Sequence, residues 1–279
     1  MDALLEPLQY AFLQRALVGG AAIAMMTGLL GVFVVQRGLA FLGDGLAHAS
    51  FGGIALGALV AYGVGGAGLL AQPLWVALPF TLAAALAIAW VRDRTDLSSD
   101  TAIGVFFAVA VALGVLFLSM IPPDANVVDV YHLLFGSILA VGPADLRIIL
   151  VTAGAIVTLL VLAWGRLAYA TFDADLAAAD GLPVRLLDYG LFAVAAIAVV
   201  VSAQVVGIVL MAAYLVIPAA AARLAARSLV AMSVGAVAIG VTTTLVGLFA
   251  SYAADVPSGA AIILLQASVF LVAALTARR

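Results

Sequence analysis

The chain contains no cysteine and no lysine, and all 11 of its basic residues are arginines. Without cysteine there are no disulfides, no thiolate metal ligands and no thiol redox switch. Without lysine there is no phosphate-binding loop of the kind that needs a lysine to reach a nucleotide. If ATP drives this protein, another subunit must hydrolyse it, and any metal must be held by carboxylate, imidazole, carbonyl or water.

Charged residues of both signs are scarce. Only 9% of the 279 residues are charged, against about 25% in an average soluble domain, and the net charge of −3 leaves no basic face for a nucleic acid. Hydrophobic residues make up 67% of the chain, and its mean hydropathy is +1.32. We therefore expect an all-α, multi-pass membrane protein that forms one transmembrane domain over residues 1–279. No removable signal peptide is expected, because the required pattern of charge and apolar residues is absent from the N-terminus.

Nine apolar stretches predict membrane spans of about 20 residues each. The expected spans are 15–35, 46–62, 74–91, 101–120, 148–164, 189–201, 205–222, 229–251 and 260–276. Residues 133–141 are apolar but too few to cross a bilayer, which predicts a short re-entrant or interfacial segment. Residues 165–188 are expected to form the longest interior polar connection. The predicted fold is a bundle of about nine transmembrane helices.

The arginines predict an orientation. With nine crossings and a cytoplasmic C-terminus, nine of the 11 arginines lie on the cytoplasmic side, and only Arg15 and Arg147 lie outside. This distribution fits the rule that positive residues stay inside. It places the start of the second span towards the cytoplasmic half of the membrane and the stretch before residue 133 on the outer side.

The start of the second span carries an acid and an imidazole four residues apart, Asp44 and His48. Residues at this spacing share one face of a helix, so both side chains can converge on one point if Asp44 is already helical. Carboxylate oxygen and imidazole nitrogen suit first-row divalent metals. Alternatively, Asp44 is only the N-cap of a helix beginning at Gly45, and His48 is an interior histidine. We favour the metal pathway, because ionisable residues at membrane depth are rare and usually functional.

A second acidic stretch precedes the short apolar segment and contains Asp124, Asp129 and His132. On the outer side, its carboxylates could raise the local concentration of a cation arriving from outside, through electrostatic focusing. Alternatively, the two aspartates are solvated loop charges and the histidine begins a helix. This stretch is therefore a candidate outer receiving site.

The 165–188 connection predicts a short, rigid helix. Asp173 or Asp175 can cap an alanine-rich turn that includes Ala177, Gly181 can end it in a left-handed conformation, and Pro183 prevents its continuation. The spacing from Asp175 to Gly181 also resembles the Glu-Ala-Ala-x-x-x-Gly pattern with which permeases of ATP-driven importers dock onto their ATPase. The alternative is an ordinary capped helix in a loop.

Six segments, in this order, resemble the metal-ion permeases of bacterial ATP-binding-cassette importers that take up zinc, manganese or iron. They are residues 31–35 with 37–48, 100–104, 134–136, 172–187, 206–207 with 215–220, and 251–252 with 257–259. Together they extend over nearly the whole chain. The resemblance assigns Asp44 and His48 to the acid and histidine of the second-helix motif, and 173–183 to the coupling helix. Many relatives carry aspartate where this chain has Ser137.

The resemblance also implies partners and a location. It implies a homodimer of permeases in the bacterial cell (inner) membrane, two copies of a cytoplasmic ATPase, and an extracytoplasmic metal-binding protein that delivers the ion. No cofactor is expected to be bound permanently, and the transported ion is a divalent metal. No nucleotide-binding motif is found in the chain, so we do not expect it to be an enzyme itself.

Three questions stay open at this point. Zinc is favoured over manganese or iron, because imidazole suits zinc and both histidines lie in candidate path positions. A gradient-driven secondary transporter or channel is a rival function, although the sequence shows no internal repeat of the kind common in secondary transporters. An importer of a chelated metal is a third possibility, but it would need a wide apolar vestibule.

Overall fold

The computed structural model describes residues 9–64, 72–122 and 136–277. In that part of the chain, nine helices are long and apolar enough to cross a membrane. They are α2 (Ala11–Gln36), α3 (Leu42–Gly63), α4 (Leu74–Arg94), α5 (Ser99–Ser119), α7 (Pro143–Phe172), α9 (Val184–Val206), α10 (Ile208–Ala225), α11 (Leu229–Ala254) and α12 (Ser258–Thr276). Two short helices, η4 (Ile138–Ala140) and α8 (Ala174–Ala179), lie between spans. The predicted all-α fold with nine spans is confirmed.

The main difference from the predicted spans is at the end of α7. This helix continues to Phe172, whereas the sequence predicted its end at residue 164 and a long polar connection after it. The extension is helical because Leu167 and Ala170 are buried on one face, while Arg166 lies exposed on another. The prediction of a long polar connection over 165–188 was therefore wrong, since only α8 and two short links separate α7 from α9.

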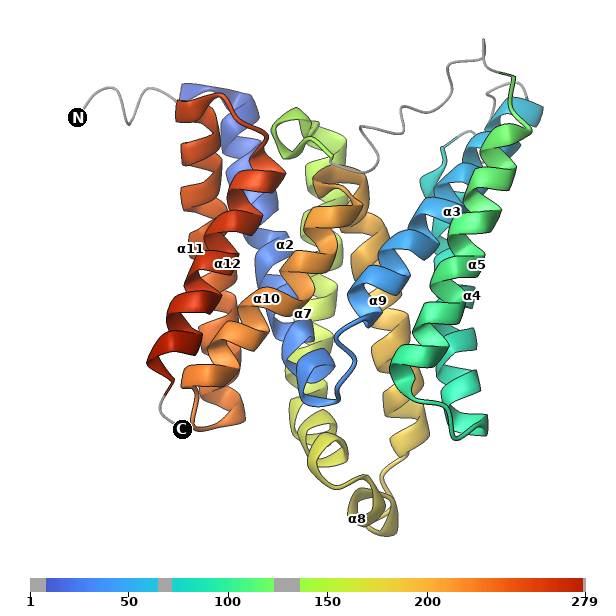
Figure 1. Cartoon of the computed structure of the whole chain (residues 1–279), viewed down its shortest axis with the longest axis vertical. Helices are drawn as coiled ribbons and strands as arrows, with labels where there is room; N and C mark the ends of the chain where they lie inside the picture. The colour runs from blue at the N-terminus through green and yellow to red at the C-terminus, as the bar shows by residue number, and fades with distance from the viewer. Residues whose placement is uncertain (1–8, 65–71, 123–135, 278–279) are drawn as a thin grey trace.

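The helices form two groups joined in the middle of the bundle (Figure 1). Helix α3 packs against α4 and α5 on one side, and α2 packs against α10, α11 and α7 on the other. Helix α9 contacts members of both groups. The start of α2 and the end of α12 lie at opposite ends of the bundle, as an odd number of crossings requires, and α8 protrudes at the end where α12 stops (Figure 1).

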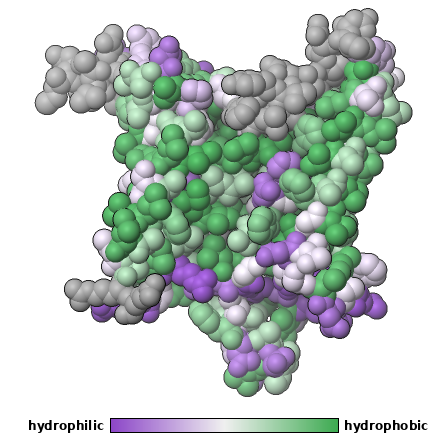
Figure 2. All heavy atoms as spheres, in the orientation of Figure 1, coloured by the Kyte–Doolittle hydropathy of each residue, from purple (hydrophilic) through white to green (hydrophobic). Residues whose placement is uncertain are grey.

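The surface has the pattern of a membrane protein. Figure 2 shows a broad hydrophobic belt and, below it, a hydrophilic band at the α8 end. Large apolar side chains such as Leu162, Val151 and Leu275 are exposed on the outer helices. In a membrane these side chains would face lipid tails, which are equally apolar, so their exposure on the bundle surface costs no hydration free energy. The arginines at or next to the helix ends on the α8 side are Arg37, Arg92, Arg94, Arg185, Arg223 and Arg227.

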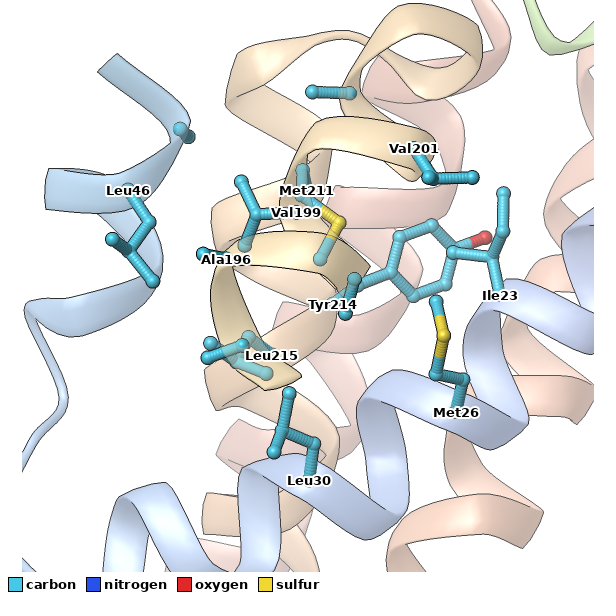
Figure 3. Close-up of a cluster of buried hydrophobic side chains, with 14 of the residues drawn as sticks. Ile23, Met26, Leu30, Leu46, Ala196, Val199, Val201, Met211, Tyr214 and Leu215 are labelled. Carbon is cyan, nitrogen blue, oxygen red and sulfur yellow. The ribbon is translucent and has the colours of Figure 1, made fainter. Parts of the chain in front are cut away.

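The packed core lies where α2, α3, α9 and α10 meet (Figure 3). Tyr214 of α10 is fully buried among apolar side chains, and its hydroxyl pairs with Thr244 Oγ1 at 2.6 Å. Helix α2 approaches α10 closely at Gly31, where an added Cβ would lie 2.0 Å from the Leu215 carbonyl oxygen. Small residues at such crossings allow helix backbones to pack directly against each other.

The described part of the short apolar segment is residues 136–141. It forms one 3-10 turn, η4, whose Ile138 is buried. The Ser137 amide donates to the Val205 carbonyl at 3.0 Å, so Ser137 lies beside the connection between α9 and α10. That connection turns at Gly207, which has a φ of 82°. The earlier residues of the predicted re-entrant segment lie outside the described residues.

Candidate functional site

Helix α3 begins two residues before Asp44. Its first residue is Leu42, its N-cap is Phe41, and no side chain caps it. The first turn is closed by the backbone, since the Gly45 amide donates to the Phe41 carbonyl at 2.9 Å. The alternative in which Asp44 is the N-cap of a helix beginning at Gly45 was therefore wrong, and the Asp44 carboxylate is not used as a cap.

The structure brings Asp44 and His48 together on one face of α3. His48 Nδ1 lies 3.4 Å from Asp44 Oδ1 and 3.0 Å from the Asp44 backbone carbonyl oxygen. The shorter contact is the hydrogen bond. A neutral imidazole that donates from Nδ1 to a carbonyl keeps a lone pair on Nε2, the arrangement common in metal-binding histidines. The carboxylate, with 45% of the Asp44 side chain exposed, remains available to a ligand.

The carboxylate of Asp44 opens onto a cavity of about 230 Å³ between α3 and α5. Its lining consists of Phe41, Asp44, Gly45, Asp100, Ile103, Gly104 and Phe107. The ring of Phe107 also packs against the His48 imidazole, with 4.4 Å between centroids. Two aspartates, each in the first turn of its helix, therefore line one cavity whose other walls are mostly apolar.

Sequence reasoning gave no role to Asp100. It lies in the matching stretch 100–104, but it is 56 positions from Asp44, and no local spacing connects the two. Among the described residues there is no group of three or more histidine and acidic side chains that could enclose a metal.

The predicted short helix is present as α8. Asp173 is its N-cap, with the Leu176 amide donating to Asp173 Oδ1 at 2.9 Å, while Asp175 lies in its first turn. Ala177 is buried. Gly181 has a φ of 84°, and the amide after it donates to the Ala177 carbonyl at 2.9 Å, which is a glycine-terminated helix end. Pro183 then directly precedes α9. The expected caps are confirmed, and docking onto an ATPase stays a prediction.

The candidate outer receiving site is not part of this geometry. Asp124, Asp129 and His132 lie outside the described residues, so their role as a receiving site stays a prediction.

Comparisons with known proteins agree over almost the full length. The manganese transport system membrane protein MntC of Listeria monocytogenes is 34% identical over 272 residues, covering 97% of this chain and 92% of that protein. A Haemophilus influenzae protein named "Probable iron transport system membrane protein" is 32% identical, covering 98% and 96%. The solved structure of PsaBC from Streptococcus pneumoniae in complex with Fab superposes with a TM-score of 0.83 at 33% identity, covering 99% and 96%. The model of the ABC 3 transport family matches residues 9–277, and the chain belongs to this family of membrane permeases.

Proposed function

We propose that this chain is the translocation pathway of an ATP-driven importer of a divalent first-row transition metal, with manganese as the first candidate. The observation that carries the proposal is the Asp44–His48 pair, of which Asp44 lines a cavity between α3 and α5 in a bundle of mostly apolar helices. The full-length relatives named for manganese and iron transport support the choice of metal.

The pair offers few protein ligands, which suits transit. An incoming ion would meet an Asp44 carboxylate oxygen and, at a neighbouring position, His48 Nε2, which the contact at Nδ1 turns away from that carboxylate, with water or the second permease copy filling the other positions. One protein ligand at a time holds a divalent ion far less tightly than a closed site does. The Asp100 carboxylate on the same cavity wall would attract the ion without enclosing it. The result is a low-affinity stop from which the ion leaves again.

The energy would come from a separate ATPase. The chain has no lysine for a nucleotide-binding loop, and α8, at the end of the bundle, offers a rigid projection on which such a subunit could dock. In this proposal two permease copies form a homodimer, two ATPase copies bind the two α8 helices from the cytoplasm, and an extracytoplasmic protein delivers the metal. The permease is one domain without catalytic groups of its own.

Zinc is the second candidate. Its support is His48, because imidazole suits zinc, whereas manganese prefers carboxylate, carbonyl and water. The names of the relatives favour manganese over the zinc predicted from the sequence. The uptake rates of the two ions separate these candidates. If manganese is the cargo, excess zinc should inhibit the uptake of radioactive manganese, but zinc itself should not accumulate at a comparable rate.

The test of the proposal is uptake by the purified permease with and without its ATPase, in liposomes loaded with a metal indicator. ATP-dependent accumulation that requires both subunits is the expected result. Accumulation by the permease alone, driven by an ion gradient and indifferent to ATP, would instead identify a secondary transporter or channel.

A further inference from the structure

Two helix ends and one connection meet at the carboxylate of Asp188. Asp188 lies in the second turn of α9, just after α8. Its Oδ1 accepts from Nη1 of Arg37, in the connection between α2 and α3, and its Oδ2 accepts from Nη2 of Arg92 in the last turn of α4 at 2.6 Å. The Arg92 guanidinium also lies 5.4 Å from the centre of the Phe192 ring. One carboxylate thus joins two arginines that are 55 positions apart.

Arg37 extends this cluster to α7. Its Nε donates to Thr171 Oγ1 at 2.9 Å, and the Thr171 hydroxyl donates to the Leu167 carbonyl at 2.6 Å. Only 8% of the Arg37 side chain is exposed. Burial lowers the pKa of Arg37 more than the neighbouring Asp188 raises it, so the carboxylate compensates only in part for the removal of this charge from water.

The position of this cluster in the chain is what suggests a role. Thr171 is the second-last residue of α7, and Asp188 lies in the second turn of α9, so the cluster holds both helices that flank α8. Arg37 belongs to the short connection that leads into α3, whose first turn carries Asp44. In the described part of the chain, the only ion pair formed by that connection is the one from Arg37 to Asp188.

We propose that the Arg37–Asp188–Arg92 cluster transmits movement of α8 to the start of α3, which makes Asp188 a positioning residue for the metal pathway. The proposal rests on the proposed function, in which an ATPase moves α8. A partly buried ion-pair cluster around the buried Arg37 suits this task because separating Arg37 from Asp188 would leave an unpaired buried charge. Helices α7 and α9 therefore cannot shift far at this end without carrying the connection and Asp44 with them.

An exposed ion pair nearby serves as the matched control. Arg185 Nε lies 3.3 Å from Asp93 Oδ1 and also joins α9 to α4, but 81% of the Arg185 side chain is exposed. The pair does not include the α2–α3 connection or α7. Neutralising Asp93 therefore removes a charge from the same two helices without breaking the proposed link, and exposed pairs of this kind contribute little to stability.

The experiment measures metal uptake and ATP hydrolysis together in liposomes that contain the assembled permease–ATPase complex. Asp188→Asn should lower the amount of metal taken up per ATP by about tenfold, within the usual range of coupling between sites. Asp93→Asn should leave this ratio at the wild-type value. An unchanged ratio in Asp188→Asn, or an equal loss in both variants, overturns the proposal. If the wild-type complex shows no ATP-dependent uptake, it is the proposed function that fails.

A milder variant covers the case in which Asp188→Asn does not assemble. Thr171→Val keeps the shape of the side chain and both ion pairs of Asp188, but it removes the hydroxyl that ties Arg37 to α7. It should lower the ratio of metal to ATP by a smaller factor than Asp188→Asn, with normal assembly. A wild-type ratio in a fully assembled Thr171→Val complex contradicts the link through α7. A purely structural role would instead lower the amount of complex and leave the ratio unchanged.

Discussion

At the scale of the residue, the proposed chemistry depends on one nitrogen of the His48 imidazole. The carbonyl of Asp44 occupies His48 Nδ1, so only Nε2 is left for a metal. In the proposed function, the Nε2 lone pair is the nitrogen ligand that α3 offers to the ion.

The first prediction follows from this. His48→Gln should lower metal uptake, because glutamine offers no imidazole nitrogen to the ion. The measurement is the initial rate of uptake, with ATP hydrolysis recorded in the same samples to correct for the ATPase. Equal initial rates in the two proteins would remove His48 from the pathway.

The second prediction concerns the crossing of α2 and α10. Gly31→Ala should destabilise the protein by about 1–3 kcal/mol, the usual cost of overpacking, because the new methyl group would meet the Leu215 carbonyl oxygen. Gly154→Ala is the control, because a Cβ added at Gly154 in α7 would meet no atom within 4 Å. This substitution should stabilise the helix by about 0.5–1 kcal/mol, since alanine has the higher helix propensity. Thermal unfolding in detergent compares them, and equal melting temperatures would contradict the close approach.

The residues of the pathway differ in how far the sequence could reveal them. Asp44 and His48 were predicted to lie together because a spacing of four fixes a shared helix face. Asp100 and Asp188 were not assigned, because their neighbours come from other helices and depend on tertiary packing. Asp188 meets Arg37 across 151 positions and Arg92 across 96, and no local pattern encodes such pairs.

At the scale of the element, the spans were predictable and their ends were less so. Apolar runs of membrane length fix a helix because the backbone has no other partner in lipid. The final turns of α7 were missed because they leave the apolar pattern and carry Arg166 and Tyr169, although Leu167 and Ala170 still pack inside. The ends of α8 were correctly predicted, since capping aspartate and left-handed glycine are local signals.

The third prediction tests α8. Gly181→Val should uncouple ATP hydrolysis from uptake, because a β-branched residue is strained at a φ of 84° and the turn that ends α8 would open. No neighbouring atom lies within 4 Å, so the effect comes from the backbone alone. Gly181→Asn is the control, because asparagine tolerates this conformation. Membrane insertion should be normal in both. Wild-type uptake and metal-stimulated hydrolysis in Gly181→Val would remove α8 from the coupling.

At the scale of the whole molecule, the Asp44–His48 pair and α8 belong to different parts of one bundle. Asp44 lies at the start of α3, in the group with α4 and α5, whereas α8 connects α7 to α9 at the end of the molecule (Figure 1). The hydrophobic belt fixes how the bundle lies in a membrane (Figure 2). In the proposed importer, an ATPase docked at α8 would influence a metal at Asp44 through the helices between them, which is where the Asp188 cluster lies.

The central claim is that a divalent metal crosses the membrane past Asp44, and Asp44→Asn tests it most directly. Asparagine keeps the size of the side chain and removes its charge. The measurement is manganese uptake by the assembled complex in liposomes, with assembly verified by co-purification of the ATPase. Uptake should fall by at least about tenfold, since losing even a supporting group around a metal has that effect. Wild-type uptake by a fully assembled Asp44→Asn complex would contradict the claim and place the metal path elsewhere.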